Sequence, residues 1–176
     1  YKIGIASTLF NLGNIAIDQE NFEQSMKFFE ESLTLTREIG SVGGIAVSLS
    51  GMGKVSNFLG NFEQAQKFLD ESLSLIRDIG EKGSIADSLN NLGSLAYNCF
   101  NYEQSKKFYE ESLAISLEIG LKSGIAKSLL GLTGILSAGN HLSRAVILLG
   151  AKEEALKSNG LVLSLTELKF NEQIVK

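Results

Sequence analysis

The run Gly51-Met52-Gly53-Lys54-Val55-Ser56 is the segment whose residue types come nearest to a chemical motif. A phosphate-binding loop needs a glycine five residues before Gly53 and Ser or Thr directly after the lysine. This chain has Ser48 and Val55 at those positions. The run also aligns with residues 11–16, which lie in a predicted helix, so we do not expect it to bind phosphate.

The remaining reactive side chains do not form a catalytic or metal-binding set. Adjacent acids such as Glu30 and Glu31 diverge by about 100° on a helix and cannot converge on one substrate atom. His141 is the only histidine, so no histidine pair can hold a metal. Cys99 is the only cysteine, and we expect it to be packed and inert at the end of a helix. The sequence therefore predicts no enzyme, no metal and no cofactor.

Composition and charge narrow the classes of partner. Of the 176 residues 44% are apolar and 20% are charged, and the net charge of −4 comes from interleaved acids and bases. No basic stripe is present to neutralise a phosphate backbone, so we expect no nucleic-acid partner. The least polar stretch, residues 128–139, is broken by glycine and shorter than the roughly 20 residues of a membrane span. One cysteine and no glycosylation sequon favour a cytoplasmic location without disulfides.

The elements that position these residues repeat every 40 residues. The tripeptide at the start of each unit recurs four times, as Gly4-Ile5-Ala6, Gly44-Ile45-Ala46, Ser84-Ile85-Ala86 and Gly124-Ile125-Ala126. Such a period is typical of a solenoid built from one supersecondary unit. We place the repeats at about 4–43, 44–83, 84–123 and 124–160 of one domain.

Each unit is predicted to contain two helices. Ile5, Leu9, Leu12 and Ala16 are spaced as one apolar helix face, and a second run with the same spacing begins at Phe22. The second helix of each of the first three units should begin at an asparagine that caps it, followed three residues later by glutamine, at Asn21, Asn61 and Asn101. It should end at a glycine in a left-handed conformation, at Gly40, Gly80 and Gly120.

Small residues recur where the paired helices must touch. The first helices carry Gly13, Gly53 and Gly93, and the second helices carry Ser25, Ala65, Ser105 and Ala145. The pattern resembles the tetratricopeptide repeat in a 40-residue variant that lacks the family's usual closing proline. The resemblance implies an all-α fold, an α-α superhelix of antiparallel helix pairs.

The two ends of the array differ from its middle. Thr133 replaces the glycine of the other units, and the capping signal near Gly139 is shifted by one residue. Drift of this kind is typical of a terminal unit, and residues 161–175 read as a capping helix. At the start, the sequence has no upstream helix that could cover Ile3 and Ile5, so we expect the array to continue upstream. Self-association of the chain through this first unit is a second expectation.

An 80-residue alternation overlies the 40-residue period. Units one and three share Asn11 with Asn91 and Phe29 with Tyr109, whereas units two and four share Gly51 with Gly131 and Leu69 with Leu149. The alternation indicates a duplication or an alternating surface.

The remaining stripe of each first helix is the expected binding surface. In tetratricopeptide families this stripe lines a concave groove that holds peptides or partner helices, and asparagine amides can both donate to and accept from an extended backbone. The alternative is a helix face that only meets solvent. The predicted partner-binding residues are Asn11, Asn14, Asp18, Lys54, Asn57, Asp87, Asn91, Ser94, Asn98 and Lys127. Basic residues are missing where the family's carboxylate clamp needs them, so we do not expect that clamp.

The resemblance leaves two functions open. The first is a protein-interaction scaffold that binds a peptide or partner helix, as the regulatory segment of a larger signalling protein. The second is an effector-sensing domain for a small molecule. The 40-residue unit is similar to regulatory arrays of bacterial signalling ATPases and LuxR-type regulators, and to those of cell-polarity adaptors.

Overall fold

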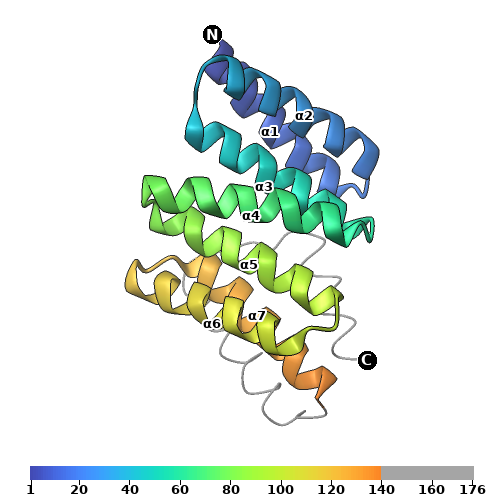
Figure 1. Cartoon of the computed structure of the whole chain (residues 1–176), viewed down its shortest axis with the longest axis vertical. Helices are drawn as coiled ribbons and strands as arrows, with labels where there is room; N and C mark the ends of the chain where they lie inside the picture. Colours follow the sequence, from blue (N-terminus) through green and yellow to red (C-terminus); the bar gives the residue numbers. More distant parts are fainter. Residues whose placement is uncertain (140–176) are drawn as a thin grey trace. The chain divides into compact units, whose positions relative to one another are not determined.

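The structure, a computed structural model, describes residues 1–139, and this part of the chain is entirely helical. Each of the first three repeats gives a pair of helices joined by a short loop, which confirms the predicted all-α solenoid of helix pairs (Figure 1). The predicted second helix of the fourth repeat and the capping helix at 161–175 lie outside the described residues. The helices are α1 (Lys2–Asp18), α2 (Phe22–Glu38), α3 (Val42–Phe58), α4 (Phe62–Ile79), α5 (Lys82–Asn98), α6 (Tyr102–Glu118) and α7 (Lys122–Ala138).

The helices form two compact units, with a boundary between Glu81 and Lys82. The first unit contains α1–α4, and the described part of the second contains α5–α7. Within the first unit α2 packs against both α1 and α3, and within the second unit α6 packs against both α5 and α7. Helices α2 and α6 therefore each join their own first helix to the next one along the chain.

Asparagine caps begin two of the three second helices as predicted. The Asn21 side chain accepts a hydrogen bond from the Gln24 backbone N–H at 3.3 Å, and Asn101 accepts one from Gln104 at 3.2 Å. The prediction is wrong for Asn61, whose side chain makes no capping hydrogen bond. The helix that follows Asn61 still begins at the equivalent residue, so the cap supports this start without being required for it.

Left-handed residues end the second helices, as predicted. Gly40, Gly80 and Gly120 have φ values of 67°, 76° and 67°. A left-handed residue also follows α1, α3 and α5, at Glu20, Gly60 and Phe100, with φ values of 58°, 76° and 59°. The sequence did not predict this conformation for Glu20 and Phe100, because they are not glycines.

One aromatic ring in each unit is held between two glycines of successive first helices. Phe29 of α2 is fully buried, and a Cβ atom built on Gly13 of α1 or Gly51 of α3 would lie 2.5 or 2.6 Å from its ring. Tyr109 of α6 lies in the same way between Gly93 of α5 and Gly131 of α7. These glycines are needed because the ring takes the space of their missing side chains.

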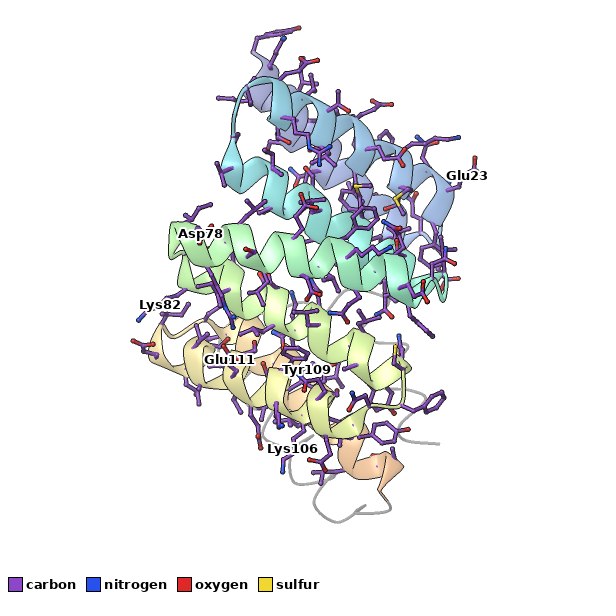
Figure 2. The ribbon with its side chains drawn as sticks, viewed as in Figure 1. Glu23, Asp78, Lys82, Lys106, Tyr109 and Glu111 are labelled. Atoms are coloured by element: carbon purple, nitrogen blue, oxygen red, sulfur yellow. The ribbon has the colours of Figure 1, made fainter. Side chains whose placement is uncertain are left out.

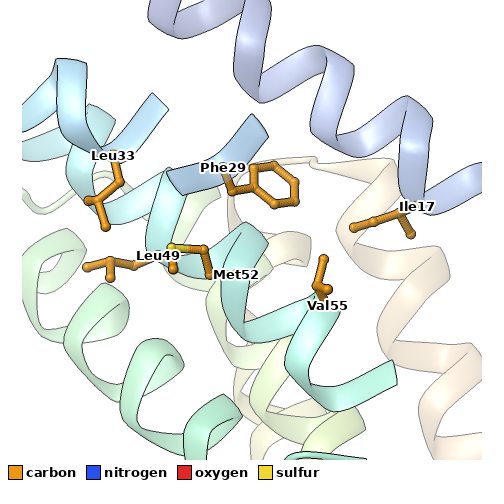
Figure 3. Packing of buried hydrophobic residues seen from close by; sticks show 6 residues of the cluster. All are labelled: Ile17, Phe29, Leu33, Leu49, Met52 and Val55. Carbon is orange, nitrogen blue, oxygen red and sulfur yellow. The ribbon is translucent and has the colours of Figure 1, made fainter. Parts of the chain in front are cut away.

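The apolar core of the first unit continues around Phe29. Figure 3 shows Phe29 and Leu33 of α2 facing Leu49, Met52 and Val55 of α3, with Ile17 of α1 completing the cluster. All six residues are at most 7% exposed. Burial of this size contributes about 1.5–3 kcal/mol for each large side chain, so this cluster is the main support of the unit.

Buried serines give the packed helices their register. Ser32 donates a hydrogen bond to the Ala6 carbonyl oxygen at 3.0 Å, and Ser72 and Ser112 donate to Ala46 and Ala86 at 2.8 Å. Buried Ser25 donates to the Gly13 carbonyl oxygen at 2.8 Å. Each bond satisfies a buried hydroxyl at a site where a larger side chain would separate the helices.

Candidate partner-binding surface

Helix α3 shows which face of a first helix the repeat leaves open. One side, with Gly51 and Val55, is buried under α2, and another side, with Gly53, is buried under Leu69 of α4. The side chain of Lys54 is half-buried and Phe58 is 46% exposed. We call the open face the first-helix stripe. It comprises Ser7, Phe10, Asn14 and Asp18 of α1; Val47, Ser50, Lys54 and Phe58 of α3; Asp87, Asn90, Ser94 and Asn98 of α5; and Lys127 of α7.

Most predicted site residues of the first unit lie on this stripe. Asn14 and Asp18 of α1 and Lys54 of α3 are half-buried. The Asn14 amide donates to the Phe10 carbonyl oxygen of its own helix at 3.2 Å, so its oxygen is the atom it turns outward in this state. Phe10 lies beside it and packs against Phe29, with 5.6 Å between ring centroids.

Two predicted residues of the first unit do not lie on the stripe. Asn57 is 7% exposed and is therefore buried within the unit, and its role in partner binding stays a prediction. Asn11 is exposed, but its position is that of Gly51, which lies under Phe29 in the following repeat. That position belongs to the packing face between successive repeats. Residues spaced four and three apart can belong to either of two neighbouring helix faces that differ by about 60°. The spacing alone therefore could not separate the open face from the packing face.

In the second unit the stripe is polar and internally bonded. Lys127 of α7 and Asp87 of α5 form an ion pair at 3.2 Å, with side chains 39% and 50% exposed. Ser94 hydrogen-bonds with the phenol of Tyr109, and the pKa of that phenol is raised above its usual range because the group is fully buried. Figure 2 shows the position of Tyr109 on α6. Asn98 is half-buried on the same face, and Asn91 is half-buried at the position of Gly51.

Asn90 is the stripe residue that sequence reasoning missed. It lies between Asp87 and Ser94 on α5 and is 6% exposed. Its Oδ1 atom accepts a hydrogen bond from Ser128 of α7 at 2.9 Å, whereas its Nδ2 atom has no acceptor among the described residues. A buried donor without an acceptor costs about 1–3 kcal/mol. The signal was an asparagine at a position that the other repeats fill with Phe10, Ser50 and Leu130.

The glycine-rich run of α3 and the single cysteine do not form the chemical sites that their residue types suggested. The run from Gly51 to Ser56 lies inside α3, so its backbone N–H groups are committed to the helix and cannot cradle a phosphate. Cys99 is exposed, and the expectation of a packed thiol is wrong because the residue lies just beyond the end of α5. His141 lies outside the described residues.

Residues 1–139 contain neither a metal-binding cluster nor a helix that could span a membrane. No group of three or more His, Cys, Asp and Glu side chains in this part of the chain could hold a metal ion. None of its helices combines the length and apolar character needed to cross a bilayer.

Comparison with known proteins identifies the family. Sequence profiles of the tetratricopeptide repeat match residues 4–78 and residues 85–119. The chain belongs to the tetratricopeptide-repeat family, as its helix pairs and glycine positions indicate. A comparison with curated protein sequences gives no match.

Solved structures share the fold at low sequence identity. A Rap protein complexed with competence and sporulation factor aligns with a TM-score of 0.83 and 16% identity over 99% of this chain and 47% of its own. The apo form of RapI gives 0.74 and 17%, over 90% and 58% of the two chains. BtubC from P. vanneervenii gives 0.69 and 17%, over 90% and 66%. The chain thus spans about half to two thirds of the length of these proteins.

Proposed function

We propose that the chain is a non-catalytic interaction scaffold, the regulatory segment of a larger signalling protein, and that its first-helix stripe binds a peptide or a helix of a partner protein. The polar character of the stripe carries the proposal. In the first unit Asn14 and Lys54 lie on a face that the neighbouring helices leave open, and in the second unit Asp87 and Lys127 do so, with the buried amide of Asn90 beneath them. An extended peptide needs both donors and acceptors along its backbone, and these side chains supply both.

The unpaired Nδ2 atom of Asn90 supports the same proposal. A backbone carbonyl bound beside the Asp87–Lys127 pair would give this donor the acceptor that it lacks. A buried polar group without a partner lowers stability and calls for an explanation, and an acceptor supplied by a bound peptide is the one we propose. A similar structure, described as a Rap protein complexed with competence and sporulation factor, agrees with partner binding by this fold.

Selection of binding peptides from a random library, followed by affinity measurements on variants, tests the proposal. Asn14→Ala with Lys54→Ala addresses the first unit, and Asn90→Leu addresses the second. We expect at least one of these variants to weaken a selected peptide about tenfold, equivalent to about 1.4 kcal/mol. The matched control is Lys107→Ala, on the exposed side of α6, which should change affinity less than twofold.

Two results would count against the proposal. Peptides whose affinity is the same for the stripe variants and the control bind elsewhere, and the stripe assignment fails. A library that yields no binder, together with a small molecule that stabilises the chain in a thermal-shift screen, would favour effector sensing instead. A ligand at 100 times its dissociation constant adds about 2.7 kcal/mol of stability, which such a screen detects.

A further inference from the structure

Tyr109 of α6 carries a hydroxyl that the packing of its ring does not require. The ring lies between Gly93 of α5 and Gly131 of α7. Phe29 of α2 fills the equivalent space between two glycines in the first unit, and Phe29 and Tyr109 are only 0% and 6% exposed. Phenylalanine is therefore sufficient to fill this space, and the hydroxyl of Tyr109 calls for another explanation.

The hydrogen-bond partner of this hydroxyl lies on the first-helix stripe. A phenol that is removed from water costs free energy unless it finds a partner, and the partner of Tyr109 is Ser94 of α5. Ser94 is half-buried, so part of it remains accessible on the stripe. A side chain of the second helix thus reaches between two first helices and contacts a residue of the proposed binding surface.

Ser94 and Asn90 present complementary hydrogen-bonding groups one helical turn apart. Residues four apart on a helix lie on the same face, with about 5–6 Å between their Cβ atoms. Asn90 has the Nδ2 donor that lacks an acceptor among the described residues. A hydroxyl oxygen has two lone pairs, so Ser94 can accept an N–H while it is bonded to Tyr109, whichever of the two hydroxyls donates. The two residues together offer one donor and one acceptor.

An extended peptide carries the matching groups along one edge. Every residue other than proline has one backbone C=O and one N–H. Groups on the same edge of an extended chain lie within two residues of each other, or about 7 Å at a rise of about 3.3 Å per residue. A peptide whose carbonyl accepts from Asn90 therefore brings an N–H of the same edge within reach of Ser94.

The other described repeats do not have this combination. The residues at the positions of Asn90 and Ser94 are Phe10 with Asn14, Ser50 with Lys54, and Leu130 with Gly134. The second-helix residue at the position of Tyr109 is Phe29 in the first repeat and Leu69 in the second, and neither has a hydroxyl. Within residues 1–139, the tyrosine hydroxyl thus occurs only in the repeat whose stripe has a serine to receive it.

We infer that Ser94 accepts a backbone N–H of the bound peptide and that the hydroxyl of Tyr109 positions Ser94 for this bond. The inference rests on the proposed function, because it takes the peptide to lie along the first-helix stripe. It adds a selectivity to that function. Proline has no backbone N–H, so the third repeat should reject a peptide with proline at the contacting residue.

An ester scan of one selected peptide tests the role of Ser94. A peptide from the library selection is labelled, and its backbone amides are replaced by esters one at a time, which removes one N–H in each variant. Affinities for the full chain are measured by fluorescence anisotropy. We expect one ester to weaken binding to the native chain about fivefold, and the same ester to weaken binding to Ser94→Ala less than about twofold.

Tyr109→Phe tests the positioning role of the hydroxyl. The variant should keep the helix content of the native chain in circular dichroism, because Phe29 shows that phenylalanine fills the same space. We expect the effect of the sensitive ester to fall from about fivefold to less than about twofold, since Ser94 is no longer held in place. Tyr102→Phe, at a half-buried position of the same helix, is the matched control and should keep the fivefold effect.

Three outcomes would overturn the inference. An ester effect of equal size on the native chain and on Ser94→Ala, in a peptide that Asn90→Leu weakens, would exclude Ser94 and leave the proposed function standing. An ester effect that survives Tyr109→Phe would exclude the positioning role of the hydroxyl. Peptides whose affinity is the same for every stripe variant and for Lys107→Ala would overturn the proposed function and this inference with it.

Discussion

Gly51→Ala tests whether the ring held between two glycines limits the packing of successive repeats. The built Cβ atom on Gly51 lies 2.6 Å from Cε1 of Phe29 and 2.7 Å from Cδ1, well inside van der Waals contact. The ring has little room to withdraw toward α1, because it also lies against Gly13, where a built Cβ atom would be 2.5 Å from Cε1. Overpacking costs about 1–3 kcal/mol, and a ring blocked on both sides belongs at the upper end.

The helix propensity of alanine acts against this cost. Replacing glycine by alanine within a helix stabilises it by about 1 kcal/mol. Subtracting this from an overpacking cost of about 3 kcal/mol leaves a net destabilisation of about 2 kcal/mol for Gly51→Ala. Gly4→Ala is the control, since nothing lies within 4 Å of a Cβ atom there, and it should leave the free energy of unfolding unchanged or raise it by up to about 1 kcal/mol.

Urea unfolding followed by circular dichroism measures the free energy of unfolding of both variants. A double-mutant cycle then shows whether the cost of Gly51→Ala comes from the Phe29 ring. In a Phe29→Leu background Gly51→Ala should cost at least about 1 kcal/mol less than in the native background, because leucine leaves room for the methyl group. Equal stability of Gly51→Ala and the native chain would refute the packing argument. Strict additivity of the two substitutions would also refute it, since the cost would then not involve the ring.

Four further results follow from individual residues. Gly80→Ala should lower the free energy of unfolding by about 1 kcal/mol in the same urea titration, because φ is 76° there; an unchanged midpoint would contradict this. Asn90→Leu should raise it by about 1 kcal/mol by removing a buried unpaired donor, and a loss of stability would show that the amide is satisfied. Burial raises the pKa of Tyr109, so the unfolded chain loses this proton first and stability should fall by up to about 1.4 kcal/mol per pH unit above about pH 10; Tyr109→Phe should lack this component, and identical pH profiles would exclude it. Cys99 is exposed and should react with a thiol reagent in native buffer as fast as in urea, whereas protection until unfolding would restore the expectation of a packed thiol.

The helix pairs could be predicted because their signals are local. Apolar residues at helical spacing, a capping asparagine and a left-handed glycine each act within one or two turns. The caps at Asn21 and Asn101 and the left-handed glycines at 40, 80 and 120 are found where the pattern placed them. The left-handed ends at Glu20 and Phe100 could not be predicted in this way. Their conformation is imposed by the loop that returns the chain to the next helix, and neither residue type favours it.

The surface was harder to predict than the fold because it depends on angles between helices. A stripe drawn from spacing alone included Asn11 and Asn57, which belong to packing faces, and omitted Asn90. Neighbouring faces of a helix differ by only about 60°, and which of them a second helix covers is decided by tertiary packing. Asp87 and Lys127 are 40 residues apart in the sequence, and their ion pair depends on how α5 packs against α7, which residue spacing alone does not give.

The 80-residue alternation is therefore explained by packing rather than by partner recognition. An aromatic residue in a second helix needs glycine in the next first helix, and within the units described this holds for Phe29 with Gly51 and for Tyr109 with Gly131. The two positions must change together, so one 40-residue unit cannot be exchanged for its neighbour without a clash or a cavity. A pair of repeats is the smallest part that can be duplicated without disturbing its own contacts.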